Sequence, residues 1–392
     1  EKSSIIYCLG ITQHWTAVDN VKSLANLAML CGQIGRPSTG VNPLRGQNNV
    51  QGACDMGGLP DVYPGYQAVK VPENQAKFEA AWGRKMSPEP GLTIMEMMQA
   101  CIDGKIKGMV ILGENPVMSD PDSAHVKHAL ESAEFFMAID IFPTPTTQIA
   151  HLVLPAASFA EVDGTFTNSE RRVQRVRRAI APLAGKTNWQ ILQELSSRLG
   201  YPLRYESAEE IYAEMAALSP AFGGISYPRL EGNGLCWPCP TPDHPGTPIL
   251  HVGRFTRGRG LFHAVEYRPP AEVPDAEYPF WMTTGTEYAH YLTATMTRRC
   301  RSLERELPEL VTDLNTEDGR RLNVGQGEYL RVSSRRGTLV SKVRLSDRVQ
   351  PGMIFMPLHY EEAAANLLTN PALDPISKTP EYKVCAVKLE RI

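Results

Sequence analysis

One segment, residues 42–58, combines a single cation with four side-chain amides and several glycines. The cation is Arg45, and the amides belong to Gln47, Asn48, Asn49 and Gln51. No acidic residue precedes Asp55 in the segment, so the guanidinium is available to an external anion. A planar carboxylate matches its parallel N–H groups, and the amides match the edges of a heterocycle. The segment therefore predicts a small-carboxylate site, and a polar surface loop with a solvated arginine is an equally good interpretation.

A second polar cluster is expected at the edge of a sheet. Residues 108–112 read as a buried strand, 121–133 as a helix and 134–141 as a second strand, which together form a βαβ unit with parallel strands. Ligands bind at the carboxyl ends of such strands, where Gly113, Glu114, Asn115 and Asp140 fall. Glu114 could accept hydrogen bonds from a purine, and an ordinary turn explains the residues equally well. The glycine pattern is neither that of a nicotinamide-binding fold nor a Walker loop.

Isolated histidines and cysteines provide weak signals. His14, His290 and His359 have no metal-chelating spacing, and each is more typical of a core or surface histidine than of a ligand. Of eight dispersed cysteines, only Cys236 and Cys239 have ligand spacing, and no second pair lies nearby. We therefore predict no metal ligands, no iron–sulfur cluster within this sequence, and reduced thiols typical of the cytoplasm.

The remaining first half alternates helix and strand. A helix over 21–34 is expected after a cap at Asp19 or Asn20, and residues 152–154 suggest another short strand. Residues 38–68 show little periodicity, and a loop of that length is usually functional. A further helix begins at Thr187, and its expected buried side consists of Trp189, Ile191, Leu192, Leu195 and Leu199.

The pattern changes after a Pro- and Gly-rich stretch at 218–250, which reads as a linker. Short strands are then expected at 280–284, 329–333, 338–343, 353–356 and 384–389. The sequence Arg335-Arg336-Gly337 should join two of them as a hairpin. Short strands in this arrangement predict a closed barrel.

Composition excludes several classes of protein. The net charge of −3 over 392 residues argues against nucleic-acid binding and against attachment to anionic lipid. No apolar stretch reaches the length of about 18 residues that a membrane-spanning helix needs. The first residues, Glu1-Lys2-Ser3-Ser4, resemble neither a signal nor a transit peptide, and we expect a processed chain or a fragment.

Taken together, these segments resemble formate dehydrogenases of the molybdopterin oxidoreductase family. The similarity is carried by residues 41–57, 59–61, 63–67, 113–116, 153–155, 315–318, 349–357 and 377–383. It implies an α/β fold in which a parallel-sheet, dinucleotide-binding region precedes a six-stranded β-barrel of double-psi type. The implied domains are 1–217, which binds one guanine-dinucleotide end of the cofactor, a linker at 218–250, and a cofactor-binding barrel at 251–392.

The resemblance also implies that this chain is the C-terminal half of such an enzyme. The family's N-terminal portion carries a four-iron four-sulfur cluster and the selenocysteine or cysteine that ligates molybdenum or tungsten. The expected partners are therefore formate, that N-terminal half and an electron-transfer subunit. Without the metal ligand, the chain alone should not turn over formate. It is expected to be a truncated product, a reading frame taken from downstream of an in-frame selenocysteine codon, or one half of a split enzyme.

The family's functional residues map onto particular positions here. Arg45 matches the catalytic arginine that orients formate, and Gly46 and Gln47 match positions close to the pterin. Gly113, Glu114, Asn115 and Asp140 match residues that hold one guanosine of the bis-molybdopterin guanine dinucleotide. The implied barrel wall consists of Thr284, Gly285, Thr286, His290, Thr293, His359, Asn366, Tyr382 and Lys383. Two positions depart from the family. Asn188 lies where the family often has an Asp near guanine, and Thr286 lies where the family commonly has a basic residue.

Two alternatives compete with formate oxidation. One is a non-catalytic scaffold of a respiratory complex, which would have no use for an anion site at Arg45. The other is a sister reductase of nitrate or another oxyanion, and the continuous Arg-Gly-Gln-Asn-Asn run of residues 45–49 favours formate over it.

Overall fold

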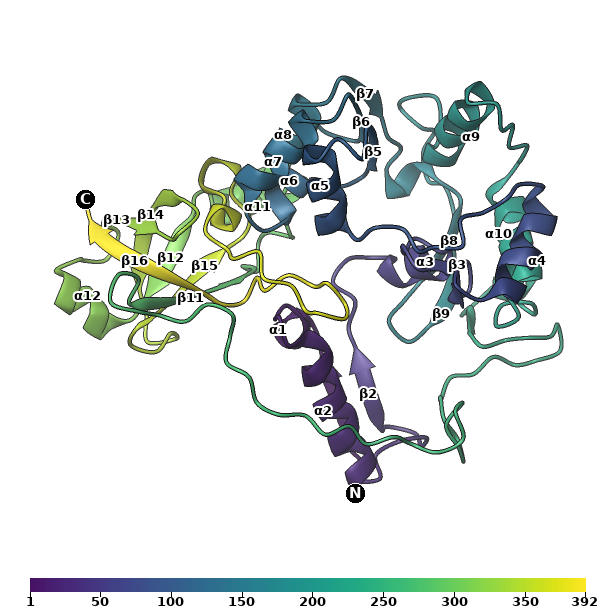
Figure 1. Ribbon diagram of the computed structural model, residues 1–392, viewed down its shortest axis with the longest axis horizontal. Helices are drawn as coiled ribbons and strands as arrows, with labels where there is room; N and C mark the ends of the chain where they lie inside the picture. Colours follow the sequence, from purple (N-terminus) through teal and green to yellow (C-terminus); the bar gives the residue numbers. More distant parts are fainter. The chain divides into compact units, whose positions relative to one another are not determined.

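The computed structural model describes all 392 residues (Figure 1). They form two compact units. Unit one comprises residues 1–9, 22–94 and 156–263, and unit two comprises residues 10–21, 95–155 and 264–392. Each unit is therefore assembled from three separate stretches of the sequence. No helix of the chain combines the length and the apolar character that crossing a membrane requires.

Unit one contains short sheets joined by helices. Strands β1 (Ser4–Tyr7) and β2 (Gly40–Pro43) are parallel, and β8 (Gly164–Thr167), β9 (Arg172–Val176) and β10 (Leu235–Cys236) form an antiparallel sheet. A small pair, β3 (Val62–Tyr63) and β4 (Gln67–Ala68), follows helix α3 (Val50–Asp55). Helices α4 (Pro72–Trp82), α9 (Asn188–Arg198) and α10 (Ala208–Leu218) also lie in this unit. The residue 38–68 segment thus holds a helix and three strands, which are too short to produce visible periodicity.

The core of unit one includes much of the expected linker. Tyr212 and Met215 of α10 pack with Phe222, Leu230 and Cys239, all buried. Residues 218–250 differ from a linker because apolar side chains between the prolines and glycines turn inward. Cys236 lies in β10, and all eight cysteines of the chain are free thiols.

Unit two contains the predicted parallel βαβ arrangement. Strands β5 (Gly108–Leu112), β6 (Phe135–Asp140) and β7 (Leu152–Pro155) are parallel neighbours in that order, which confirms the prediction. They are accompanied by α5 (Ile94–Ile102), α6 (Pro116–Ser119), α7 (Ser123–Glu131) and α8 (Pro145–Gln148). Only alternate side chains of β5 are buried, with Met109 and Ile111 in the core and Val110 and Leu112 exposed. The strand is half-buried, not fully buried as expected, because the core lies on one face of the sheet.

Unit two also contains the closed barrel, as predicted. Its six strands are β11 (Phe280–Gly285), β12 (Val311–Leu314), β13 (Tyr329–Ser333), β14 (Thr338–Leu345), β15 (Met353–Pro357) and β16 (Cys385–Arg391) (Figure 1). They are hydrogen-bonded in the order β11-β15-β12-β14-β13-β16. The hairpin at 335–337 joins β13 to β14, whereas β12 was not predicted. Its four residues contain polar Thr312 and Asp313, both buried, which hide the alternation of a strand.

Two predicted helices differ in extent or burial. Helix α2 covers Ala17–Leu30, so it begins before the expected cap and ends earlier. Helix α9 begins at the expected Thr187, whose side chain forms a capping box with Gln190. No residue of α9 is buried, however, and Leu192 is 40% exposed. The other α-helices are the short α1 (Leu9–Thr12), α11 (Arg301–Glu306) and α12 (Thr316–Leu322). Five 3-10 helices complete the structure: Phe159–Glu161, Tyr227–Leu230, Thr297–Arg299, Glu361–Ala363 and Ala365–Leu367.

Candidate functional site

Arg45 is an exposed residue of the loop between β2 and α3 in unit one. Its backbone N–H donates to Ser169 Oγ at 3.1 Å, and its Nε donates to Gln51 Oε1 at 3.1 Å. No carboxylate pairs with it, and its two Nη atoms have no hydrogen-bond partner in the chain. Arg45 is thus fixed at one end and retains the pair of terminal N–H groups that binds a carboxylate.

A buried polar network lies behind Arg45. Gln51 Nε2 donates to Asp55 Oδ1 at 2.9 Å and to the Tyr66 hydroxyl at 2.6 Å. Trp237 Nε1 donates to the other oxygen of Asp55, Oδ2, at 3.0 Å. Burial raises the pKa of Asp55, and hydrogen bonds from the side chains of Gln51, Tyr66, Thr167 and Trp237 oppose that rise. Asp55 is 2% exposed, so this carboxylate depends on its donors for solvation.

The glycines of this segment approach other parts of the chain. A Cβ at Gly52 would lie 2.1 Å from Oδ1 of Asn49, the oxygen that accepts the N–H of Thr167 at 2.9 Å. This bond connects the start of α3 to β8. Gly46 differs, because the nearest atom to its Cβ position is Leu9 Cδ1 at 3.9 Å. Gly46 and Gln47 are both exposed beside Arg45, where the resemblance places the pterin.

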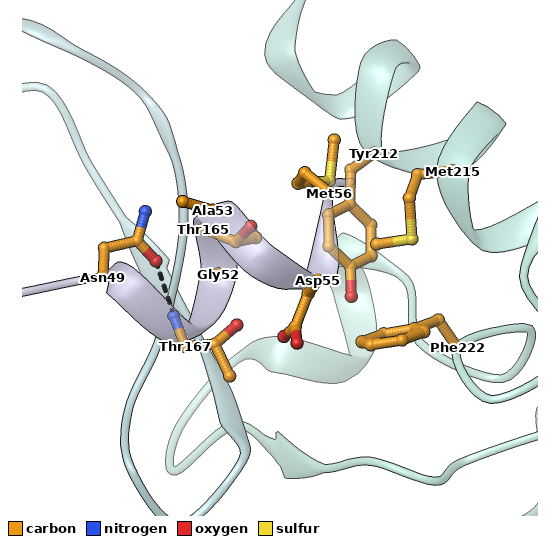
Figure 2. A pocket seen from close by; sticks show the side chains of 10 residues that line it. All are labelled: Asn49, Gly52, Ala53, Asp55, Met56, Thr165, Thr167, Tyr212, Met215 and Phe222. Atoms are coloured by element: carbon orange, nitrogen blue, oxygen red, sulfur yellow. Dashed lines mark hydrogen bonds between the residues drawn. The ribbon is translucent and has the colours of Figure 1, made fainter. Parts of the chain in front are cut away.

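A small cavity of about 90 Å³ adjoins α3 on the Asp55 side (Figure 2). Figure 2 shows the Asp55 carboxylate and the Tyr212 hydroxyl directed into the same space, beside Phe222. The Tyr212 hydroxyl is buried without a hydrogen-bond partner in the chain. The cavity has room for a few water molecules, which would satisfy both groups.

The predicted residues at the carboxyl ends of β5 and β6 meet at one sheet edge in unit two. Gly113 has a φ of 67°, and no atom lies within 4 Å of its Cβ position. Asn115 is buried, and its Oδ1 accepts the Thr146 hydroxyl at 2.7 Å. Asp140 Oδ1 accepts the N–H of Ile141 at 2.7 Å, and burial raises the pKa of this carboxyl. Glu114 is exposed at the same edge.

Near this edge, Asp120 has a buried carboxylate oxygen without a partner. Its Oδ1 accepts the Ser119 hydroxyl at 3.1 Å, whereas Oδ2 is buried and accepts no hydrogen bond. Desolvation, reinforced by the charge of Glu114, raises the pKa of Asp120 to about 7. An unsatisfied buried acceptor of this kind fits a ligand with N–H donors, such as a purine amine. The sequence pattern gave no indication of this residue.

A larger cavity of about 270 Å³ lies where the sheet edge meets the barrel within unit two. Predicted residues Asn115, Thr293 and His359 line it, together with Arg298 and Arg299, which were not predicted. Arg299 forms no ion pair and packs over the Phe142 ring with its guanidinium carbon 4.5 Å from the ring centre. It donates only to the neutral carbonyls of Thr295 and Pro143. Its charge is therefore available to an anion such as a phosphate. The signal in the sequence that could have identified these residues was a pair of consecutive arginines in a chain of net negative charge.

Several predicted residues of the barrel wall have their polar groups satisfied within the chain. His359 Nδ1 bonds Leu292 O at 2.5 Å, and its Nε2 accepts the N–H of Glu287 at 2.8 Å. Burial lowers the pKa of this ring. His290 likewise uses both ring nitrogens, on Thr297 and Leu307. The other internal bonds are Thr284 Oγ1 to Tyr382 O, Lys383 Nζ to Thr284 O, Asn366 Nδ2 to Met118 O, and Thr293 Oγ1 to Thr295 Oγ1. Of these residues, Thr293 and His359 line the larger cavity.

Three predicted positions are not among these residues. Thr286 is exposed at the end of β11, and a Cβ at Gly285 would lie 2.6 Å from the Phe355 ring. Asn188 lies in unit one, where its Oδ1 accepts the N–H of Ala157 at 2.8 Å. This contact connects the start of α9 to the chain that follows β7.

Two family profiles, several curated proteins and a solved structure are similar to this chain. The profile of the family "Molybdopterin oxidoreductase" matches residues 1–198, and that of the "Molydopterin dinucleotide binding domain" matches residues 280–386. The alpha subunit of the F420-dependent formate dehydrogenase of Methanocaldococcus jannaschii is 50% identical over 398 residues, covering the whole chain and 58% of that protein. The assimilatory nitrate reductase catalytic subunit of Bacillus subtilis is 36% identical, over 97% of the chain and 56% of that protein. The acetylene hydratase of Pelobacter acetylenicus shares the fold, with a TM-score of 0.62 at 17% identity over 82% of the chain and 50% of that structure.

Proposed function

Since this chain belongs to the molybdopterin oxidoreductase family, we propose that it is the C-terminal part of the catalytic subunit of a formate dehydrogenase. That subunit would oxidise formate to carbon dioxide or catalyse the reverse reaction. The chain spans 58% of the length of the relative from M. jannaschii, whose name includes formate dehydrogenase. Identity to that protein is 50%, against 36% to the nitrate reductase, which supports formate over nitrate.

The observation that carries the proposal is the state of Arg45. Its Nε is occupied by Gln51, no acidic side chain neutralises it, and its Nη pair is free of chain partners. A formate carboxylate can accept two parallel hydrogen bonds from that pair, which leaves its C–H bond directed away from the guanidinium. Arg45 binds the anion more strongly than it binds neutral carbon dioxide, so it also favours release of the product.

The residues of unit two fit a bound guanine dinucleotide. Arg299 would bind a phosphate, and Glu114 and the unsatisfied oxygen of Asp120 would accept N–H groups of guanine. Gly113 leaves open space at the carboxyl end of β5. When bound, the bis-molybdopterin guanine dinucleotide with its molybdenum or tungsten supplies the redox chemistry, which no amino-acid side chain offers.

The proposal extends to the rest of the subunit. An N-terminal half would supply the four-iron four-sulfur cluster and the cysteine or selenocysteine ligand of the metal, so this chain alone would be inactive. An electron-transfer subunit would receive the electrons, and the enzyme would work in the cytoplasm. Within the chain, residues 1–217 would hold one guanine-dinucleotide end of the cofactor, and residues 251–392 would form the rest of the cofactor site. Residues 218–250 would connect these two regions in the sequence.

Arg45→Lys in the full-length, cofactor-loaded subunit tests the function. Lysine keeps the charge but loses the planar pair of donors, so kcat/KM for formate should fall at least 100-fold, about 2.7 kcal/mol. Steady-state kinetics with formate, and with nitrate as the competing substrate, measure this. Unchanged formate turnover would remove Arg45 from the mechanism. Absence of metal and of pterin fluorescence in the purified full-length subunit would favour a scaffold.

A further inference from the structure

We propose that Gln51 and Asp55 are positioning residues that fix the orientation of Arg45 for carboxylate binding. The inference rests on the proposed function, because it assumes that Arg45 binds formate. Neither residue touches the open Nη pair of Arg45. They act on its opposite edge, through Nε.

The orientation of the Gln51 amide is determined by its neighbours. A side-chain amide has an acceptor on one side and two N–H donors on the other. Both donors of Gln51 are used, on Asp55 Oδ1 at 2.9 Å and on the Tyr66 hydroxyl at 2.6 Å. The acceptor Oε1 must therefore face Arg45, where it receives Nε–H at 3.1 Å.

Asp55 is the anchor of this arrangement. An ionised carboxylate only accepts hydrogen bonds, so it imposes a direction on its donors, which include Gln51 and Trp237. Trp237 belongs to the core segment 218–250, and its ring contacts those of Tyr66 and Phe222. The direction of Arg45 is thereby tied to the core of unit one rather than to the loop alone.

The arrangement has a consequence for substrate binding. With Nε occupied, a carboxylate can pair with Arg45 only through its terminal Nη edge, which gives one binding geometry instead of two. A side chain that is already held also loses less conformational freedom when formate binds. Loss of the network should therefore weaken formate binding more than it slows the chemical step.

Asp55→Asn in the full-length, cofactor-loaded subunit tests this. The amide that this substitution introduces would direct N–H groups at one of two donors, Gln51 Nε2 or Trp237 Nε1. Relief by rotation of Gln51 would bring its N–H groups against the Nε–H of Arg45. We expect KM for formate to rise about tenfold with kcat changed less than threefold. Gln51→Met, which removes the acceptor directly, should give the same split if the Asp55→Asn variant folds poorly.

A matched control is available in the same unit. Gln75 Nε2 donates to Glu79 Oε1 at 3.1 Å in α4, so Glu79→Gln disturbs an amide–carboxylate pair remote from Arg45 in the hydrogen-bond network. It should leave KM and kcat unchanged. Tyr66→Phe, which keeps the Gln51–Asp55 bond, should raise KM less than threefold.

Crystal structures of the parent subunit and both variants provide a readout that does not need turnover. Arg45 should be ordered with Nε on Gln51 in the parent, and displaced or disordered in Asp55→Asn and Gln51→Met. If the parent shows this order but oxidises no formate, positioning stands and the proposed function fails. An ordered Arg45 and an unchanged KM in both variants would overturn the positioning role.

Discussion

Arg45 in unit one and Arg344 in unit two are both held by side chains, but acidic partners neutralise the charge of Arg344 alone. Arg344, on β14, donates to Asp313 on β12 and to Glu287 at 2.5 Å. Arg45 has only the neutral amide of Gln51 as its side-chain partner. Arg344 is neutralised within the fold, whereas Arg45 is oriented but not neutralised. The difference teaches that the charge of the partner distinguishes a structural arginine from one available to a ligand.

The largest expected effect comes from breaking the structural arginine. Arg344→Met leaves Asp313 and Glu287, both largely buried, without their charged partner. Removal of one member of such a cluster costs roughly 3–5 kcal/mol. Urea denaturation should show this loss in the free energy of unfolding. A change below about 1 kcal/mol would mean that Arg348, 4.0 Å from Asp313, replaces Arg344, and the comparison would weaken.

A second prediction concerns Asp120, an acidic residue that, like Arg45, has no oppositely charged partner. Its pKa of about 7 when folded exceeds the ordinary value of 3.8, so the folded state holds this proton more tightly than the unfolded chain. Stability should then fall as pH rises from about 4 to about 7. Asp120→Asn abolishes this dependence. The difference in free energy of unfolding between the variant and the parent should therefore grow by roughly 2–3 kcal/mol from pH 5 to pH 8.

Urea denaturation of the cofactor-free protein at pH 5 and pH 8 measures the Asp120 effect. Ser119→Ala keeps the carboxyl but removes the hydrogen bond to Oδ1 that opposes the rise in the Asp120 pKa, so the fall in stability should persist and extend to higher pH. Identical pH profiles for the parent and Asp120→Asn would show that the carboxylate is already satisfied. In that case Asp120 would lose its argument as an acceptor for guanine.

The sequence predicted those features that depend on neighbours along the chain. Apolar runs separated by turns predicted β5, α7 and β6, and the lone cation among amides predicted Arg45. Strand β12 was missed because the partner of its buried Asp313 lies on β14. The role of Gln51 was missed because its amide is oriented by a carboxylate that Trp237, 182 residues further along, holds in place. Long-range partners of polar groups cannot be read from composition or periodicity.

The predicted histidines illustrate the same point. His290 and His359 were assigned to the cofactor wall by resemblance, and both use their ring nitrogens on groups of the chain. Their assignment as ligands of the cofactor stays a prediction. What the structure adds is that their rings are fixed, so they can shape a wall without donating to a ligand.

The smallest expected effect sharpens the comparison most. Arg45→Met removes one hydrogen bond, from Nε to Gln51, and no ion pair. The loss in free energy of unfolding should be about 1 kcal/mol or less, well below that of Arg344→Met. Urea denaturation of the two variants side by side measures the ratio. If both arginines proved equally important for stability, Arg45 would be a structural residue and its availability to formate would have no support. If the Arg45→Met protein is stable, the fold does not need the guanidinium. The buried network that orients Arg45 is then explained by ligand binding and not by folding.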